Sequence, residues 1–323
     1  MQNISFDYIE DELKMVESQF ETHLATETPL IQRVAKYVIS SGGKRIRPIL
    51  LLVSSKICGY KGDDHIPLAA VIEFIHTATL LHDDVVDNAP LRRGKSSANT
   101  VFGNEASVLV GDYLFAKSFK VLSSLDNMDV IKAYSIAVTL MAEGEVKELV
   151  KTADIKTTED DYLDIIIKKT AVLFACASQI GAIISLKNDE YGQNLYDYGL
   201  NIGIAFQLMD DALDYTSKNE EFGKFIGNDL KEGKLTLPLI HTMERCLNSE
   251  KDIVSEIIYK KKLTNADLQA VLKLVKSYDS IDYTISKAKA AVLKAKENLN
   301  VFPDSEHKRN LTDIANYIIE RKL

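Results

Sequence analysis

The chain has 323 residues, 46% of them hydrophobic, which is enough to bury a sizeable core as one large domain or two ordinary ones. Its formal net charge of −8 argues against nucleic acid as a partner, because phosphate backbones are bound by basic surfaces. The three scattered cysteines predict a reduced, cytoplasmic compartment. The acidic, amphipathic N-terminus and the lack of a long apolar run predict neither a leader nor a transmembrane segment.

Proline occurs six times but never between Pro90 and Pro238, so the strongest helix breaker is missing from a long central region. Apolar residues recur at three- and four-residue spacing in 130–149 and 166–180, which is typical of helices. No alternating pattern indicates a sheet. The expected breaks between helices, in chain order, are 40–48, 57–67, 88–97, 151–161, 218–238 and 301–307. We therefore expect one all-α domain over residues 1–323, with roughly ten helices.

The first cluster of acid is "HDDVVD" at 82–87, at the end of an apolar helix that we expect to begin near Val71. Asp83 and Asp87 share one helix face, with Asp84 beside them. Three carboxylates at a helix C-terminus repel each other and the helix dipole. A solvated helix end explains this segment as well as a bound cation does.

The pattern then occurs a second time. In "FQLMDDALD" at 206–214, Asp210, Asp211 and Asp214 again end an apolar helical stretch at i, i+1 and i+4. Mg²⁺ prefers oxygen ligands and is usually held by one or two carboxylates with substrate phosphates completing its shell. Two such helix ends facing each other predict a site for Mg²⁺ and a diphosphate.

Basic residues also recur in groups at loops and helix edges. Taken singly, each is more often a solvated surface residue, but glycines in "GGKRIRP" allow close approach to a ligand, and Arg and Lys both bind phosphate oxygens. Several separate patches suggest two phosphorylated substrates. His76 joins the second site or is an ordinary interior histidine. The groups are Lys44, Arg45 and Arg47; Arg92 and Arg93; Lys168 and Lys169; and Lys224, Lys231 and Lys234.

These residues resemble those of the trans-isoprenyl diphosphate synthases, which elongate linear polyprenyl diphosphates. A lone DDxxD is a weak signal, whereas two together with the other motifs are a strong one. The resemblance implies an all-α isoprenoid synthase fold around a central cavity, three Mg²⁺ ions and a homodimer. The matching stretches run in order along nearly the whole chain: "GGKRIRP" at 42, "HDDVVD" at 82, "RRG" at 92, "GDYL" at 111, "KKTA" at 168, "FQLMDDALD" at 206, "GKFIGNDLKEGK" at 223 and "TLP" at 236.

The resemblance also implies roles for individual residues. Both aspartate clusters would bind the allylic diphosphate through Mg²⁺. Its direct ligands would be Arg92, Lys169 and Lys224, with Lys234 a weaker candidate. The pocket for isopentenyl diphosphate would be formed by Lys44, Arg47, His76 and Arg93. Thr170 and Gln207 would lie near the reacting carbons. Glu145 departs from the glutamine that many relatives carry there.

The implied reaction is ionisation of the allylic C–O bond, attack by the double bond of isopentenyl diphosphate, and loss of a proton to the released pyrophosphate. Ala78 and Thr79 lie about one turn before Asp83, where short-chain members of the family typically carry a bulky aromatic. Both residues are small here, so we expect a long product of about C30–C50, as used for quinone side chains. The floor of the channel would come from Tyr134, Val138 and Met141, which ordinary core packing explains equally well.

Three alternatives stay open at this point. A class I terpene cyclase shares the first aspartate motif, but its second metal site usually mixes Asn, Ser or Thr with Glu. A non-catalytic subunit of a heteromeric synthase would be expected to lose one cluster. A helical interaction module explains only the periodicity. The apolar helix at 106–122 is either a dimer interface or core, and transient membrane contact during product release is a further possibility.

Overall fold

The computed structural model describes residues 7–216, 227–260 and 263–320, whose regular secondary structure is helical apart from one short strand pair. The predicted all-α class is confirmed. The chain forms two compact units, and the expectation of a single domain over 1–323 stays a prediction. Unit 1 comprises Met1–Val138, Leu173–Gly199 and Leu299–Asp313, and unit 2 comprises Thr139–Val172, Leu200–Asn298 and Ile314–Leu323.

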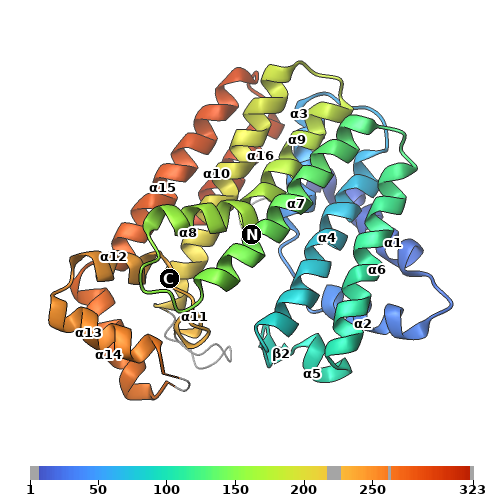
Figure 1. The fold of residues 1–323 in the computed structure, drawn as a ribbon. Helices are drawn as coiled ribbons and strands as arrows, with labels where there is room; N and C mark the ends of the chain where they lie inside the picture. Colours follow the sequence, from blue (N-terminus) through green and yellow to red (C-terminus); the bar gives the residue numbers. More distant parts are fainter. Residues whose placement is uncertain (1–6, 217–226, 261–262, 321–323) are drawn as a thin grey trace. The chain divides into compact units, whose positions relative to one another are not determined.

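Unit 1 holds the N-terminal helices, drawn in blue to cyan in Figure 1. The long helices α7, α10 and α16 each contribute residues to both units. The elements with residues in unit 1 are η1 (Asp7–Ile9), α1 (Glu10–Leu24), α2 (Pro29–Ser40), α3 (Ile46–Ile57), α4 (His65–Val86), β1 (Leu91–Arg92), β2 (Lys95–Ser96), α5 (Ala98–Phe102), α6 (Asn104–Ser123), α7 (Met128–Lys151), α9 (Val172–Ile184), α10 (Asp189–Asp214), η4 (Leu299–Val301) and α16 (Glu306–Glu320).

The core of unit 1 is built on α3 and α4, whose side chains are apolar on nearly every face. In α4 the residues from Leu68 to Ile75 are all buried, so this helix lies inside the unit and α6 runs beside it (Figure 1). Close packing of α4 against α6 depends on Gly111, because a Cβ at this position would lie 2.2 Å from Nε2 of His82. This contact accounts for the glycine of "GDYL" and braces the helix next to the first aspartate cluster.

Unit 2 is made of the remaining helices and the second halves of α7 and α10. Its helix α8 begins with a capping box, in which Thr158 accepts a hydrogen bond from the backbone of Asp161 and the Asp161 carboxylate accepts from the backbone of Thr158. Its further elements are α8 (Glu159–Ile166), η2 (Ile167–Ala171), α11 (Asn228–Lys231), α12 (Leu237–Arg245), α13 (Asn248–Ile258), α14 (Asn265–Ser277) and α15 (Ser280–Asn298).

Most predicted breaks coincide with gaps between helices, and the expectation of an all-α fold with roughly ten or more helices is confirmed. The structure contains α-helices α1 to α16 in the described residues, and several of the extra boundaries carry no proline. Gly103, with φ of 91°, separates α5 from α6, and a short gap separates α12 from α13. Helix α4 begins at His65, not near Val71, because Pro67 is tolerated in the first turn of a helix.

Within the part of the chain that the structure describes, one helical stretch is long and apolar enough to cross a membrane by length and composition alone. It is Glu159–Ile184, with a mean hydropathy of 1.4 over 18 residues. In the structure 78% of that window is buried by other parts of the protein, which is the pattern of a core helix.

Candidate active site

The first aspartate cluster lies at the C-terminus of α4, where Asp87 is the C-cap residue. Asp84 is only 1% exposed, and its Oδ1 lies 2.7 Å from Nε of Arg92. Strands β1 and β2 bring that arginine back toward the helix end, and their turn is Arg93-Gly94, with positive φ at both residues. The amide of Asn99 donates to the backbone carbonyl of Asp84 at 2.9 Å. Arg92, which follows the aspartate cluster in the sequence, therefore neutralises the charge of Asp84 in the folded protein.

The residues expected to bind isopentenyl diphosphate all lie in unit 1. The guanidinium of Arg93 lies so close to Gly43 that a Cβ there would be 3.1 Å from its Nη1. Burial lowers the pKa of His76 well below its usual value, and the nearby charges of Arg47 and Arg93 lower it further. The guanidinium of Arg47 stacks 4.2 Å from the ring centroid of Phe174. Cationic groups thus gather around a neutral histidine.

Neighbouring basic residues in "GGKRIRP" differ in their surroundings. Arg45 is held by Glu73, which is buried, and by Glu17 at 3.1 Å, so it ties the loop to the core. Lys44 is exposed, and Arg47 is half-buried. The assignment of Lys44 and Arg47 as ligands stays a prediction, and only the fold distinguishes Arg45 from them.

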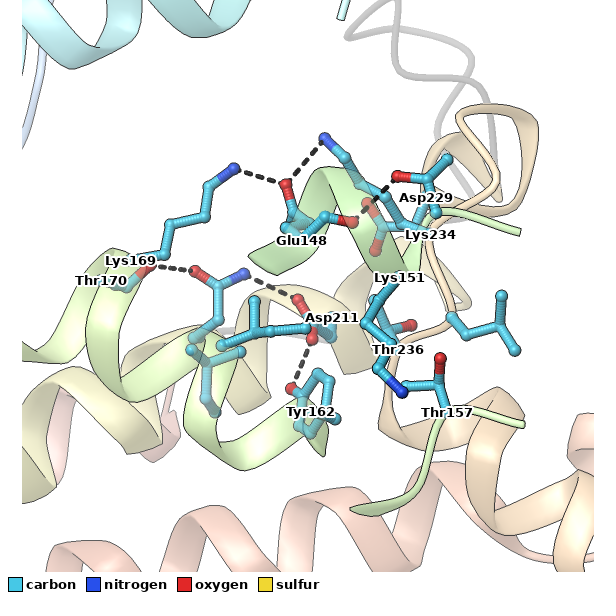
Figure 2. A pocket seen from close by; sticks show the side chains of 15 residues that line it. Glu148, Lys151, Thr157, Tyr162, Lys169, Thr170, Asp211, Asp229, Lys234 and Thr236 are labelled. Atoms are coloured by element: carbon cyan, nitrogen blue, oxygen red, sulfur yellow. Dashed lines mark hydrogen bonds and ion pairs between the residues drawn. The ribbon is translucent and has the colours of Figure 1, made fainter. Parts of the chain in front are cut away.

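The second cluster ends α10 in unit 2, and its middle residue is again the buried one. Asp211 is 3% exposed; Gln207 donates to its Oδ1 at 2.8 Å, and Tyr162 donates to its Oδ2 at 2.5 Å. Thr170 in turn donates to the side-chain carbonyl of Gln207 at 3.0 Å, so four residues form one chain of hydrogen bonds (Figure 2). Burial, reinforced by Asp210 and Asp214, raises the pKa of Asp211 to about 7 despite the two hydrogen bonds.

Asp214 contacts the start of α11. Its Oδ1 and Oδ2 accept hydrogen bonds from the backbone N–H groups of Asn228 and Asp229, each at 3.2 Å, at the start of α11. Asp229 thereby comes close to the cluster; burial raises the pKa of its carboxyl well above the usual value, and Asp211 and Asp214 add to the rise. A fourth acidic side chain therefore belongs to this site.

The lysine and threonine of "KKTA" lie in a π-helical segment, η2, between α8 and α9. Such segments are rare and often found at functional sites. Two glycines allow the neighbouring helices to approach it: a Cβ on Gly144 of α7 would lie 2.6 Å from the backbone nitrogen of Lys169, and one on Gly203 of α10 would lie 2.4 Å from Cα of Ala171. These contacts fix the positions of Lys169 and Thr170 relative to α7 and α10.

The lysines of unit 2 lie against glutamates. Nζ of Lys169 is 2.9 Å from Glu145 and 2.6 Å from Glu148, and Nζ of Lys234 is 2.8 Å from Glu232 and 3.7 Å from Glu148. Lys169, Lys234, Thr170, Gln207 and Asp211 line one pocket with Glu148 (Figure 2). Lys224, predicted to contact the diphosphate, lies outside the described residues.

The residues expected to set product length lie one turn before the first cluster. Ala78 is fully buried, whereas Thr79 is half-buried and its hydroxyl donates to the carbonyl of His76 at 2.8 Å. Tyr134 of α7 is fully buried and donates to the carbonyl of Leu68, deeper along α4, at 2.7 Å. These contacts leave their role in a product channel as a prediction.

Tyr162, Glu148 and Asp229 were missed by sequence reasoning. Tyr162 lies 49 residues from Asp211, so no local pattern connects them. Asp229 stands within "GNDLKEGK", where the lysines drew attention, and an acidic residue two positions after Gly227 was the available signal. Glu148 follows Glu145 by three residues, which places both on the same helix face.

The donor set fits a hard divalent cation. Each of the two clusters offers carboxylate oxygens, which are ligands that such a cation prefers. Within the residues that the structure describes, no three His, Cys, Asp or Glu side chains converge closely enough to hold an ion by themselves. Mg²⁺ usually takes part of its coordination shell from substrate phosphate oxygens.

Comparison with known proteins gives a consistent answer. The family model described as polyprenyl synthetase matches residues 28–275. Octaprenyl diphosphate synthase of Escherichia coli is 41% identical over 298 residues, which cover 92% of each chain. An all-trans-nonaprenyl-diphosphate synthase of Rhodobacter capsulatus, specific for geranyl diphosphate, is 40% identical and covers 92% of this chain and 91% of that protein.

Solved structures agree with the sequences. A decaprenyl diphosphate synthase from Rhodobacter capsulatus superposes with a TM-score of 0.93 at 40% identity, covering 98% of this chain and 97% of that one. A polyprenyl synthase from Caulobacter crescentus, complexed with calcium and isoprenyl diphosphate, gives 0.94 at 38% identity with the same coverage. The chain therefore belongs to the polyprenyl synthetase family, and it is a prenyltransferase of the long-chain, all-trans type.

Proposed function

We propose that this prenyltransferase adds isopentenyl diphosphate repeatedly to an allylic diphosphate, with farnesyl diphosphate as the primer. The product is an all-trans polyprenyl diphosphate of about C30–C50 that provides quinone side chains. The observation that carries the proposal is that each unit places cationic side chains near an intact aspartate cluster. Asp84 pairs with Arg92 in one unit, and Asp211 lines one pocket with Lys169 and Lys234 in the other. The octaprenyl and decaprenyl synthases among the relatives support the long product.

The side chains divide between the two substrates. The allylic diphosphate is bound by Arg92, Lys169, Lys224 and Lys234, with Mg²⁺ held by Asp83, Asp84, Asp87, Asp210, Asp211 and Asp214. Isopentenyl diphosphate is bound by Lys44, Arg47, His76 and Arg93. Neutral His76 suits this role because it can donate a hydrogen bond to a phosphate oxygen without adding charge to the arginines around it.

Mg²⁺, with three ions expected from the family, supplies charge neutralisation for the departing diphosphate when bound. The lysines and Arg92 orient the diphosphate and stabilise the charge that develops on it as the allylic C–O bond breaks. The double bond of isopentenyl diphosphate then forms the new C–C bond with the allylic cation, and one proton passes to the released pyrophosphate. Oxygen dipoles of Thr170 and Gln207, locked by the hydrogen bond between them, steady the cation without reacting with it.

Product length follows from the small residues before the first cluster. With Ala78 and Thr79 the growing chain passes along α4, and the Tyr134 region stops it. Ala78→Tyr is expected to shorten the main product by several isoprene units, because an aromatic ring at a fully buried position leaves no room for the chain. An unchanged product in mass spectrometry would show that Ala78 does not line the path.

We propose further that the protein is a cytoplasmic homodimer that contacts the membrane only during product release. Apolar side chains on the outer face of α6 support an interface there, among them Leu109, which is 67% exposed, and Phe119, which is 40% exposed. Sedimentation of the purified protein tests the dimer.

The function is tested by mass spectrometry of products from farnesyl diphosphate and excess isopentenyl diphosphate with Mg²⁺, with and without EDTA. The expected result is a metal-dependent ladder that ends at one long polyprenyl diphosphate. Cyclic hydrocarbon products would move the assignment to a terpene cyclase. No turnover with any allylic primer would favour the non-catalytic subunit.

A further inference from the structure

Glu148 of α7 lies between two lysines that come from different elements. Its Oε2 is 2.6 Å from Nζ of Lys169 in η2 and 3.7 Å from Nζ of Lys234, which follows α11 (Figure 2). The side chain is 23% exposed, so it is partly shielded from water but open to the pocket that it lines. One carboxylate therefore contacts both cationic groups.

These contacts matter because the same two lysines are the proposed ligands of a diphosphate, and the inference rests on that proposed function. A carboxylate and a phosphate oxygen accept the same N–H bonds from a lysine, and each carries negative charge. Glu148 and a bound diphosphate consequently compete for Lys169 and Lys234, and they repel each other when both are present.

Glu148 differs from the other glutamates of the pocket in this respect. Glu145 contacts Lys169, and Glu232 contacts Lys234. Glu148 contacts both lysines. It also comes from α7, which packs closely against η2 at Gly144, so its backbone is positioned next to Lys169.

We propose that Glu148 is an internal counter-anion for the diphosphate-binding lysines. It holds Lys169 and Lys234 in place while no diphosphate is bound, weakens the binding of pyrophosphate, and so promotes its release. A synthase that makes a long chain must release pyrophosphate after every condensation. Tight retention of this product would slow each cycle, and a resident carboxylate lowers that affinity at no cost in the number of cationic ligands.

The test is the affinity of the full-length protein for inorganic pyrophosphate, measured by calorimetry in Mg²⁺ and again in EDTA. Glu148→Gln keeps the shape of the side chain but removes its charge, and we expect pyrophosphate to bind about tenfold more tightly under both conditions. Glu148→Asp keeps the charge but withdraws it by one methylene, and an intermediate gain is expected.

Glu143→Gln is the matched control. Glu143 is on the same helix, is 55% exposed, and pairs with Lys168 at 3.4 Å, so its loss changes the net charge equally without touching the two lysines. Its affinity for pyrophosphate is expected to stay within about twofold of the wild type, because exposed charges are screened. Thermal unfolding of each variant checks that the fold is intact.

Unchanged or weaker binding of pyrophosphate by folded Glu148→Gln would overturn the proposal, since the carboxylate would then be organising the lysines and not competing for them. An equal gain in Glu143→Gln would also overturn it, because net charge alone would explain the result. Product formation by the wild type is measured in parallel. If the wild type elongates normally but Glu148→Gln does not bind pyrophosphate more tightly, only this inference fails. If Glu148→Gln binds pyrophosphate more tightly but the wild type does not elongate, the proposed function fails.

Discussion

The two aspartate clusters have the same spacing, and in each the middle residue is buried, yet the two buried carboxylates are stabilised differently. Asp84 lies against the guanidinium of Arg92, a full positive charge. Asp211 accepts hydrogen bonds from the neutral groups of Gln207 and Tyr162, and the pKa of its carboxyl is raised to about 7. The same motif thus produces an ion pair in unit 1 and a carboxyl group that accepts hydrogen bonds from neutral donors in unit 2.

The two clusters also differ in what the glycines of the supporting helices pack against. At the first, Gly111 of α6 packs against the end of the His82 side chain, which can rotate away. At the second, Gly203 of α10 packs against the backbone of Ala171 in η2, which cannot. The first cluster is therefore stabilised mainly by the charge of Arg92 and by packing against the His82 side chain. The second is stabilised by packing against backbone and by hydrogen bonds from neutral donors.

The largest expected effect is on catalysis, and we expect it to be equal for the two clusters. Asp83→Ala and Asp210→Ala should each lower the rate of prenyl transfer by about a thousandfold, because each removes a carboxylate that we assign to Mg²⁺. Turnover is measured by product formation at saturating substrate, with circular dichroism to confirm the fold. Asp129→Ala, at an exposed position of α7, is the control and should be near normal. Near-normal activity of either cluster variant would remove its cluster from the metal site.

A second test compares the glycines that support the clusters. Gly203→Ala should lower the free energy of unfolding by about 3 kcal/mol, because its Cβ meets backbone, whereas Gly111→Ala should cost about 1 kcal/mol, because His82 can move. Gly192→Ala, also in α10 but with open space around it, should stabilise by about 0.5 to 1 kcal/mol. Denaturant unfolding gives all three values. A larger cost for Gly111→Ala than for Gly203→Ala would reverse the comparison.

The partners of the buried carboxylates provide the third test. Arg92→Gln removes the counter-charge of Asp84 and should destabilise by about 2 kcal/mol, less than for a fully buried pair because the arginine side chain is 29% exposed. Tyr162→Phe removes one neutral hydrogen bond from Asp211 and should cost about 1 kcal/mol. Both are measured by urea unfolding at pH 7. If Tyr162→Phe were the more harmful, the second cluster would depend on its partner more than the first does.

The smallest effect concerns His76 in unit 1. The pKa of its imidazole is lowered well below 6.5 by burial and then by Arg47, Arg93, Arg92 and Arg45, so below about pH 6.5 the unfolded chain binds a proton that the folded chain does not. The wild type should therefore lose about 1 kcal/mol of unfolding free energy between pH 7 and pH 5 relative to His76→Gln. Parallel pH dependence of the two proteins would show that His76 is not held neutral.

Several features of the site were predictable because they depend on local sequence. The helix ends that carry Asp83 and Asp210, the loops around Lys44 and Arg92, and the resemblance of their motifs all follow from residues a few positions apart. The start of α4 at His65 was misplaced, since Pro67 reads as a break although it is tolerated in a first turn. The short hairpin at 91–96 was also missed, because two paired residues make no alternating pattern.

The sequence by itself determined the all-α class, the two acidic clusters and the cationic residues near them, because helix periodicity and motif spacing are written along the chain. Only the tertiary structure decided which carboxylate of each cluster is buried and what neutralises it. Tyr162, Glu148 and Asp229 reach the site from remote or overlooked positions, and the partners of a charge depend on which helices pack together. Burial and pairing are properties of that packing, so no local pattern encodes them.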